Sequence, residues 1–186
     1  MKHYKVKDLM VPLSEYAVIS EDATIFDAVL ALEKTQQTFN KNSYHSRAIL
    51  IEDSKKNIIG KLDQFDILRS LEPKYAEIKS DMPGMAKYGF SKQFLLSILE
   101  TYKMFDKPLD DICQKAGMEL AVKYMHSPTE GECISADGSL DQAIHMLVVE
   151  KLQSLLVTQE KKIIGILRLT DVFANISQHI KKECKI

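Results

Sequence analysis

One short motif occurs twice in the chain, and this duplication constrains the fold more than any other feature. Each copy holds two isoleucines, then a glycine, and an aspartate six positions after the glycine. The glycine and the aspartate are Gly60 and Asp66 in the first copy, and Gly165 and Asp171 in the second. A glycine inside an apolar strand usually marks a bulge or a close approach by a ligand or by backbone. Each copy therefore predicts a buried strand that runs into a helix carrying the aspartate.

The duplication extends outward from the motif, so we expect two structural repeats. Four residues of the first repeat recur in the second at one constant spacing: Met10, Ile19, Asp22 and Ala28 match Met125, Ile134, Asp137 and Ala143. The two motifs themselves lie closer together than this spacing. The first repeat is therefore the longer one, and its extra residues are best placed in Gln36 to Ser46.

Hydrophobic periodicity predicts the same order of elements in both repeats, namely strand, helix, strand, strand, helix. The first helix begins at Thr24 and Asp27, which have capping-box spacing, and its counterpart begins at Ser139 and Gln142. The two strands after this helix are short, apolar and separated by a polar turn, which is typical of a hairpin. We therefore expect an α/β (α+β) fold of two βαββα repeats, the first in residues 1–71 and the second in residues 119–186.

Residues 72–118 match neither repeat and are predicted to form a helical insert. Apolar side chains recur at helical spacing from Ser91 to Phe105, and a second short helix is expected between Pro108 and Gly117. The apolar face of the first helix has to be buried. It either packs on the repeats of its own chain, or it forms a dimer interface or a lid over a ligand.

Composition argues against several classes of protein. Of the 186 residues, 45% are hydrophobic and 27% are charged, and the net charge of −1 gives no electrostatic case for binding nucleic acid or acidic membranes. Three widely spaced cysteines favour neither a disulfide framework nor a zinc site. The amino terminus lacks an apolar signal core, and no apolar run is long enough to cross a bilayer, so a cytoplasmic protein is expected.

Sequence motifs for catalysis are not recognised. The five histidines show no metal-ligand spacing with one another or with the cysteines, and the seven glycines form no phosphate-binding loop motif. An insert of this length seldom builds an independent catalytic core. We therefore expect no metal, no cofactor and no enzymatic activity.

The duplicated motif resembles that of tandem cystathionine-β-synthase (CBS) domains, a regulatory pair also called a Bateman module. In that family a glycine is followed by two apolar residues, a threonine or serine, two variable residues and an aspartate, after a hairpin and before a helix. The resemblance covers about Val6 to Leu71 and Ala121 to Ile180, and each repeat also has a lead-in with methionine shortly before proline. It implies that the repeats pack about a pseudo-two-fold axis and leave two clefts for an adenosyl ligand.

The resemblance assigns Asp66 and Asp171 to the ribose of this ligand. A carboxylate that accepts hydrogen bonds from two vicinal hydroxyls makes strong charge-assisted bonds. The alternative is that each aspartate only favours the amino-terminal end of its helix, where the dipole attracts negative charge. Both roles can hold together.

The chain departs from the family at the threonine or serine position, which faces phosphate. Asp63 stands there in the first repeat and would repel a phosphate, so the first cleft either is empty or prefers a ligand with a neutral or positive group. Arg168 stands there in the second repeat and would attract phosphate through its fork of donors. Alternatively, Arg168 pairs with Asp63 or Asp66 across the repeat interface. Arg47 matches a position where some relatives hold phosphate with arginine, and Gln153 is its counterpart.

Pocket walls are expected, besides Asp63, from the lead-ins and the first strands: Leu13, Ser14, Ile19, Ser127, Thr129 and Ile134.

The leading hypothesis is a regulatory module that binds AMP, ADP, ATP or S-adenosylmethionine and passes its occupancy to a regulated partner protein. The rival hypothesis is a ligand-free dimerisation scaffold, which the substitutions Asp63 and Arg168 favour. The family resemblance also implies a homodimer.

Overall fold

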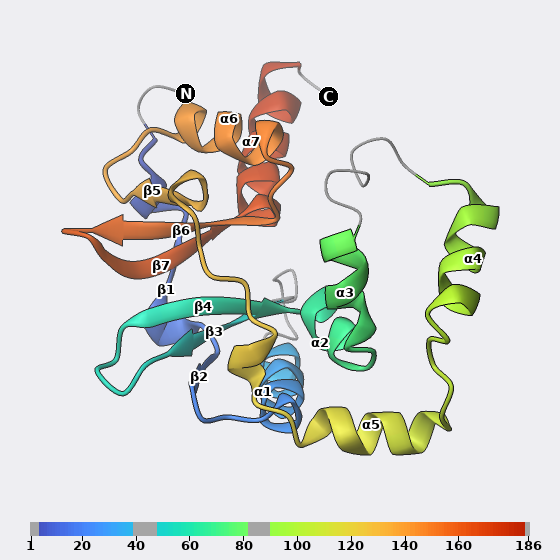
Figure 1. Ribbon diagram of the computed structural model, residues 1–186. Coiled ribbons are helices and arrows are strands. Elements are labelled where there is room, and N and C mark those ends of the chain that lie inside the picture. Colours follow the sequence, from blue (N-terminus) through green and yellow to red (C-terminus); the bar gives the residue numbers. More distant parts are fainter. Residues whose placement is uncertain (1–3, 39–47, 82–89, 185–186) are drawn as a thin grey trace.

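The computed structural model describes residues 4–38, 48–81 and 90–184. Two small sheets face each other at the centre of the molecule, with α1 below one sheet and α6 and α7 above the other (Figure 1). The first repeat consists of β2 (Val18–Ser20), α1 (Ile25–Thr38), β3 (Ala48–Glu52), β4 (Ile58–Asp63) and α2 (Gln64–Ser70). The second consists of β5 (Cys133–Ser135), α6 (Leu140–Val149), β6 (Ser154–Gln159), β7 (Lys162–Arg168) and α7 (Leu169–Glu183). The predicted α/β fold of two βαββα repeats is confirmed.

Both sheets follow the same topology. In the first, β2 lies parallel to β3, and β3 pairs antiparallel with β4; in the second, β5, β6 and β7 repeat this arrangement. The helix caps also match, because Thr24 and Asp27 exchange hydrogen bonds at the start of α1, and Ser139 and Gln142 do so at the start of α6. A shared hydrophobic cluster joins the two sheets, and its buried members are Leu50, Leu156 and Ile166.

The lead-in of the first repeat belongs structurally to the second repeat. Strand β1 (Val11–Pro12) pairs antiparallel with β7 and forms the edge of the second sheet. Upstream of it, the Val6 N–H donates to the carbonyl of Gly138 at 3.0 Å, and the Val6 side chain is fully buried in the core of the second repeat. The second core is therefore completed by residues from the other end of the chain.

The lead-in of the second repeat packs on the first repeat in the same way. The Ala121 N–H donates to the Ala23 carbonyl at 2.9 Å, and Ala121 is fully buried in the core of the first repeat. Further along, Lys61 on β4 and His126 exchange two backbone hydrogen bonds of 3.0 and 2.8 Å. The lead-in that precedes each repeat in sequence therefore packs on the other repeat. This reciprocal exchange binds the two repeats together.

The glycines of the duplicated motif make room for these crossing lead-ins. A Cβ on Gly165 would lie 2.6 Å from the Val11 carbonyl oxygen, and a Cβ on Gly60 would overlap the side chain of Met125. Next to each glycine, the pairing register of the hairpin shifts, as in a β-bulge. The predicted bulge is therefore present in both repeats, while the close approach is by backbone at Gly165 and by a side chain at Gly60.

The described residues of the insert include the helices α3 (Lys74–Asp81), α4 (Lys92–Thr101) and α5 (Leu109–Gly117). The helix predicted for residues 91–105 ends earlier, since Lys103 and Phe105 have positive φ values of 46° and 55°. α5 contacts α1 and buries Ala116. α4 buries none of its residues, with Leu95 and Leu96 each 49% exposed, and it lies at the edge of the molecule (Figure 1). Packing on the chain's own repeats therefore holds for α5 and not for α4.

Candidate functional site

The two aspartates assigned to ribose occupy equivalent places. Strand β4 runs directly into α2 and strand β7 directly into α7, so that Asp66 and Asp171 are each the third residue of their helix. At this place a carboxylate interacts favourably with the free N–H groups and the dipole of the helix. The helix-terminus role considered from the sequence therefore applies to both residues. Their side-chain partners, however, differ.

In the first repeat the aspartate is part of a closed network. The Asp66 N–H donates to Asp63 Oδ1 at 3.0 Å, and the Asp63 N–H donates to Asp66 Oδ2 at 2.9 Å, which makes a reciprocal capping box. The other oxygen of Asp66 pairs with Arg69, which also donates to the Tyr124 carbonyl at 3.3 Å. Since Tyr124 belongs to the crossing lead-in, this network fastens the second lead-in to the first repeat.

Burial changes the protonation of Asp66, which is only 6% exposed. Desolvation raises the pKa of this carboxyl, and the neighbouring Asp63 carboxylate adds to the increase, while the Asp63 N–H and Arg69 act in the opposite direction. The folded state therefore holds the proton to a higher pH than an exposed aspartate would. A carboxylate that is desolvated and already has partners for both oxygens is poorly available to a ligand.

In the second repeat the aspartate has one strong partner from its own repeat. Arg168 is the N-cap residue of α7, but its side chain reaches past the cap to Asp171. Its Nε lies 2.6 Å from Asp171 Oδ2 and its Nη2 lies 2.8 Å from Oδ1, which is a bidentate pair. The two side chains are 14% and 22% exposed. Arg168 therefore pairs with Asp171 of its own repeat, and the predicted pair with Asp63 or Asp66 across the repeat interface is wrong.

The remaining predicted residues are divided between core and surface. Ile19 packs against the core of the first repeat, and Ile134 is buried in the core of the second. Leu13 packs on the cluster between the sheets, while Ser14 and Ser127 are exposed. These residues therefore lie in three separate surroundings, and Ile134 also lines a cavity between β5 and α6. Arg47 lies outside the described residues.

Thr129 forms a further capping box, with Glu132, in the lead-in of the second repeat. Its N–H donates to Glu132 Oε2 at 2.9 Å, and the same oxygen lies 2.6 Å from His126 Nε2. Burial raises the pKa of Glu132, but the Thr129 N–H and His126 outweigh this effect and leave the pKa below its usual range. Because His126 pairs with Lys61 through its backbone, this carboxylate stiffens the lead-in where it crosses β4.

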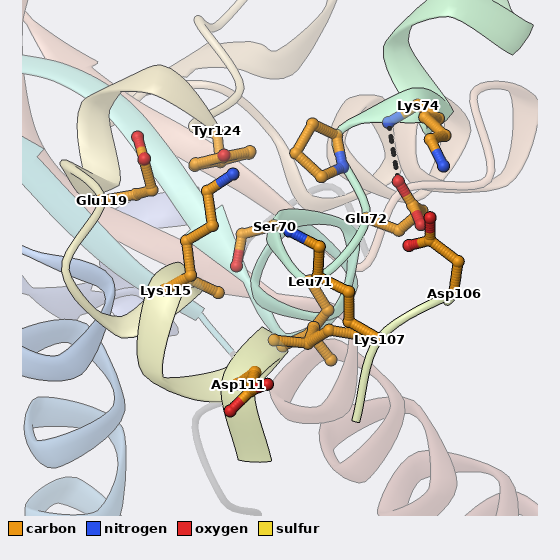
Figure 2. A pocket seen from close by; sticks show the side chains of 13 residues that line it. Ser70, Leu71, Glu72, Lys74, Asp106, Lys107, Asp111, Lys115, Glu119 and Tyr124 are labelled. Carbon is orange, nitrogen blue, oxygen red and sulfur yellow. Dashed lines mark hydrogen bonds between the residues drawn. The ribbon is translucent and has the colours of Figure 1, made fainter. Parts of the chain in front are cut away.

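Sequence reasoning did not single out Arg69, although its spacing from Asp66 on a helix is that of an interacting pair. It also gave no sign of a cavity of about 670 Å³ between the end of α2 and the insert. Figure 2 shows Lys115 of α5 extending toward Tyr124 at this cavity, with Glu72 on the α2–α3 connection and Lys74 at the start of α3. Charges of both signs line the cavity: Glu72, Asp106, Asp111 and Glu119, with Lys74, Lys107 and Lys115.

A smaller cavity of about 580 Å³ lies on the outer side of α2 and is mainly apolar. Among the residues that the structure describes, no group of three or more His, Cys, Asp or Glu side chains is placed to hold a metal ion. Over the same ranges, no helix combines the length and the apolar character needed to cross a membrane.

Structural comparison shows the same fold in other chains at low sequence identity. CBSX2, solved in complex with AMP, is 19% identical, with a TM-score of 0.58 over 95% of this chain and 98% of that one. The CBS domain of a bacterial CNNM/CorC family Mg²⁺ transporter, solved with ATP, is 14% identical, with a TM-score of 0.59 over 95% and 89% of the two chains. The CBS domain of a membrane protein from Sphaerobacter thermophilus is also 14% identical, with a TM-score of 0.59 over 93% and 88%.

Family comparison adds a sequence-level match. No match was found among curated proteins. The family model described as CBS domain matches residues 6–73 and 123–178, and these two segments coincide with the two repeats. The matched segments make up more than half of the chain and leave most of the insert outside. The crossing lead-ins, the paired hairpins and the duplicated glycine–aspartate motif therefore have one explanation, which is that the chain belongs to the CBS-domain family as a tandem pair.

Proposed function

We propose that this CBS pair is a regulatory module that binds an adenosyl compound at the second motif, with Asp171 accepting from the ribose hydroxyls. The observation that carries the proposal is the position of Asp171, at the end of β7 and the start of α7, with the guanidinium of Arg168 beside it. Two proteins of the same fold were solved with AMP and with ATP, which supports a nucleotide as the ligand. Arg168 supplies the positive charge that a phosphate needs.

The first motif is a weaker candidate for this role. Asp66 is buried, and its oxygens accept from the Asp63 backbone and from Arg69. Opening this network for a ligand would also release the hydrogen bond from Arg69 to Tyr124. A carboxylate at Asp63 would in addition repel a phosphate. We therefore propose one nucleotide per chain.

Regulation would follow from the exchanged lead-ins. Strand β1 pairs with β7, so a ligand at the end of β7 lies close to a segment that continues into the first repeat. A ligand that binds better to one arrangement of the two repeats shifts the equilibrium toward that arrangement, by no more than its difference in affinity. A regulated partner protein would respond to this arrangement.

Calorimetric titration tests the proposal. AMP, ADP, ATP and S-adenosylmethionine are titrated into the wild type and into Asp171→Asn, which keeps the size of the side chain and removes its charge. We expect at least one compound to bind the wild type with one site per chain, and Asp171→Asn to bind it about tenfold to a hundredfold more weakly, as for a lost charged hydrogen bond. Absence of heat for all four compounds would contradict the proposal.

A second candidate function, a ligand-free dimerisation scaffold, is favoured by one apolar surface. On α2, Phe65 is 81% exposed and Leu68 is 58% exposed, and together with Tyr75 and Phe105 they line the smaller cavity. A second copy of the chain would bury these side chains. Light scattering is expected to give a dimer for the wild type and a monomer for Phe65→Ser/Leu68→Ser. A monomeric wild type would exclude the scaffold.

A further inference from the structure

The bidentate pair between Arg168 and Asp171 occupies the place where a ribose would bind. Nε and Nη2 of one guanidinium face both oxygens of one carboxylate, at 2.6 and 2.8 Å. Two vicinal hydroxyls of a ribose would approach the same edge of the carboxylate with the same two-donor geometry. The guanidinium therefore has to move before Asp171 can accept from both hydroxyls.

Moving Arg168 is costly unless the ligand offers it a new anion. The Arg168 and Asp171 side chains are only 14% and 22% exposed, so water compensates poorly for the lost contact. A phosphate on the ligand can accept the same fork of N–H groups that the carboxylate accepts. A nucleotide thus exchanges one anion for another at Arg168, while a nucleoside supplies hydroxyls to Asp171 and offers Arg168 no anion in exchange.

We propose that Arg168 is an autoinhibitory residue, which closes the second motif in the absence of ligand and restricts it to adenosyl compounds that carry a phosphate. This inference rests on the proposed function and adds a selectivity to it. AMP, ADP and ATP are accepted, whereas adenosine, which carries the ribose without any anionic group, is excluded. Arg168 thus acts on both parts of the ligand, as a competitor for the ribose site and as the partner of the phosphate.

The first repeat provides the matched control, because Arg69 pairs with Asp66 there. Arg69 follows its aspartate on the helix and is also bonded to the Tyr124 carbonyl, whereas Arg168 precedes its aspartate and stands at the position that faces phosphate in the family. The same substitution at the two arginines therefore separates a general loss of an ion pair from the specific effect of Arg168.

The experiment measures the affinities of AMP and adenosine by calorimetry for the wild type, Arg168→Met and Arg69→Met, with circular dichroism as the check of folding. In the wild type we expect AMP to bind at least about a hundredfold more tightly than adenosine. Arg168→Met should weaken AMP binding about tenfold and strengthen adenosine binding about tenfold, so that the ratio of the two affinities falls to about one. Arg69→Met should leave the ratio unchanged. Arg168→Lys keeps the charge without the fork, and should raise the adenosine affinity even if Arg168→Met does not fold.

The outcomes separate this inference from the function on which it rests. If Arg168→Met or Arg168→Lys weakens AMP without strengthening adenosine, Arg168 only binds phosphate and the autoinhibition is overturned, while the proposed function stands. An equal affinity of the wild type for AMP and adenosine overturns the selectivity in the same way. If AMP, ADP, ATP, S-adenosylmethionine and adenosine all fail to bind the wild type and the variants, the proposed function itself is overturned, and the autoinhibition with it.

Discussion

The two glycine–aspartate motifs have the same backbone and different side-chain networks. In the first repeat, the carboxylate of Asp66 is held by the Asp63 backbone and by Arg69, and Arg69 reaches the crossing lead-in at Tyr124. In the second repeat, the carboxylate of Asp171 is held by the side chain of Arg168. The first network joins segments that are distant in sequence, so breaking it disturbs the fold. The pair of Arg168 and Asp171 joins neighbours on one short segment, and on the proposed function a ligand replaces this pair.

The largest expected effect is on stability, from removing the two aspartates in turn. Asp66→Ala leaves the Asp63 N–H without its acceptor and removes the ion pair of the partly exposed Arg69 side chain, and we expect a loss of about 2–3 kcal/mol in the free energy of unfolding. Asp171→Ala removes a partly buried pair that lies within one segment, and we expect a smaller loss of about 1–2 kcal/mol. Urea denaturation of both variants measures the two losses. Equal losses would show that the two networks are equivalent.

For the two motif glycines we expect the opposite order, in which the substitution in the second repeat costs more stability than the one in the first. A Cβ on Gly165 would meet the backbone oxygen of Val11, which cannot move without shifting β1, so Gly165→Ala should cost about 1–3 kcal/mol. A Cβ on Gly60 would meet the flexible side chain of Met125, which can change rotamer, so Gly60→Ala should cost less than about 1 kcal/mol. Thermal unfolding of both variants checks the order. A larger loss for Gly60→Ala would contradict this account of the lead-ins.

A smaller effect is expected in the pH dependence of stability. Burial raises the pKa of Asp66 above the ordinary value of 3.8, so the folded state favours the protonated acid. The stability that this provides is complete below pH 3.8 and is lost as the pH rises through the higher pKa of the folded state. The free energy of unfolding of the wild type, relative to Asp66→Asn, should therefore fall as the pH rises above 3.8. Denaturation at a series of pH values measures it, and a relative stability that rises with pH would contradict the burial of this carboxyl.

Much of the fold could be predicted because its signals are local. The helix caps at Thr24 and Ser139, the apolar hairpins and the duplicated glycines each lie within a few residues of one another, and the structure confirms them. The crossing of the lead-ins could not be predicted in this way. It depends on backbone hydrogen bonds between distant segments, such as Val6 with Gly138, and these leave no periodic pattern in the sequence.

The candidate site was predictable in its residues and less so in its contacts. The motif identified Asp66 and Asp171 and placed both at helix starts, as the structure has them. The direction of the Arg168 side chain could not be predicted, because both Asp171 and the carboxylates of the other repeat were available as partners. Ile19 and Ile134 both pack in the cores of their repeats, as apolar strand residues usually do, and their role as pocket walls stays a prediction.

The most direct test of a ligand site at the second motif is the shift in melting temperature that AMP produces in the wild type, Asp171→Ala and Asp66→Ala, each relative to its own ligand-free value. Ligand at about a hundred times its dissociation constant stabilises the folded state by about 2.7 kcal/mol, or roughly 5–10 °C for a chain of this size. We predict such a shift in the wild type and in Asp66→Ala, and its loss in Asp171→Ala. A shift that survives Asp171→Ala and disappears in Asp66→Ala would contradict the account.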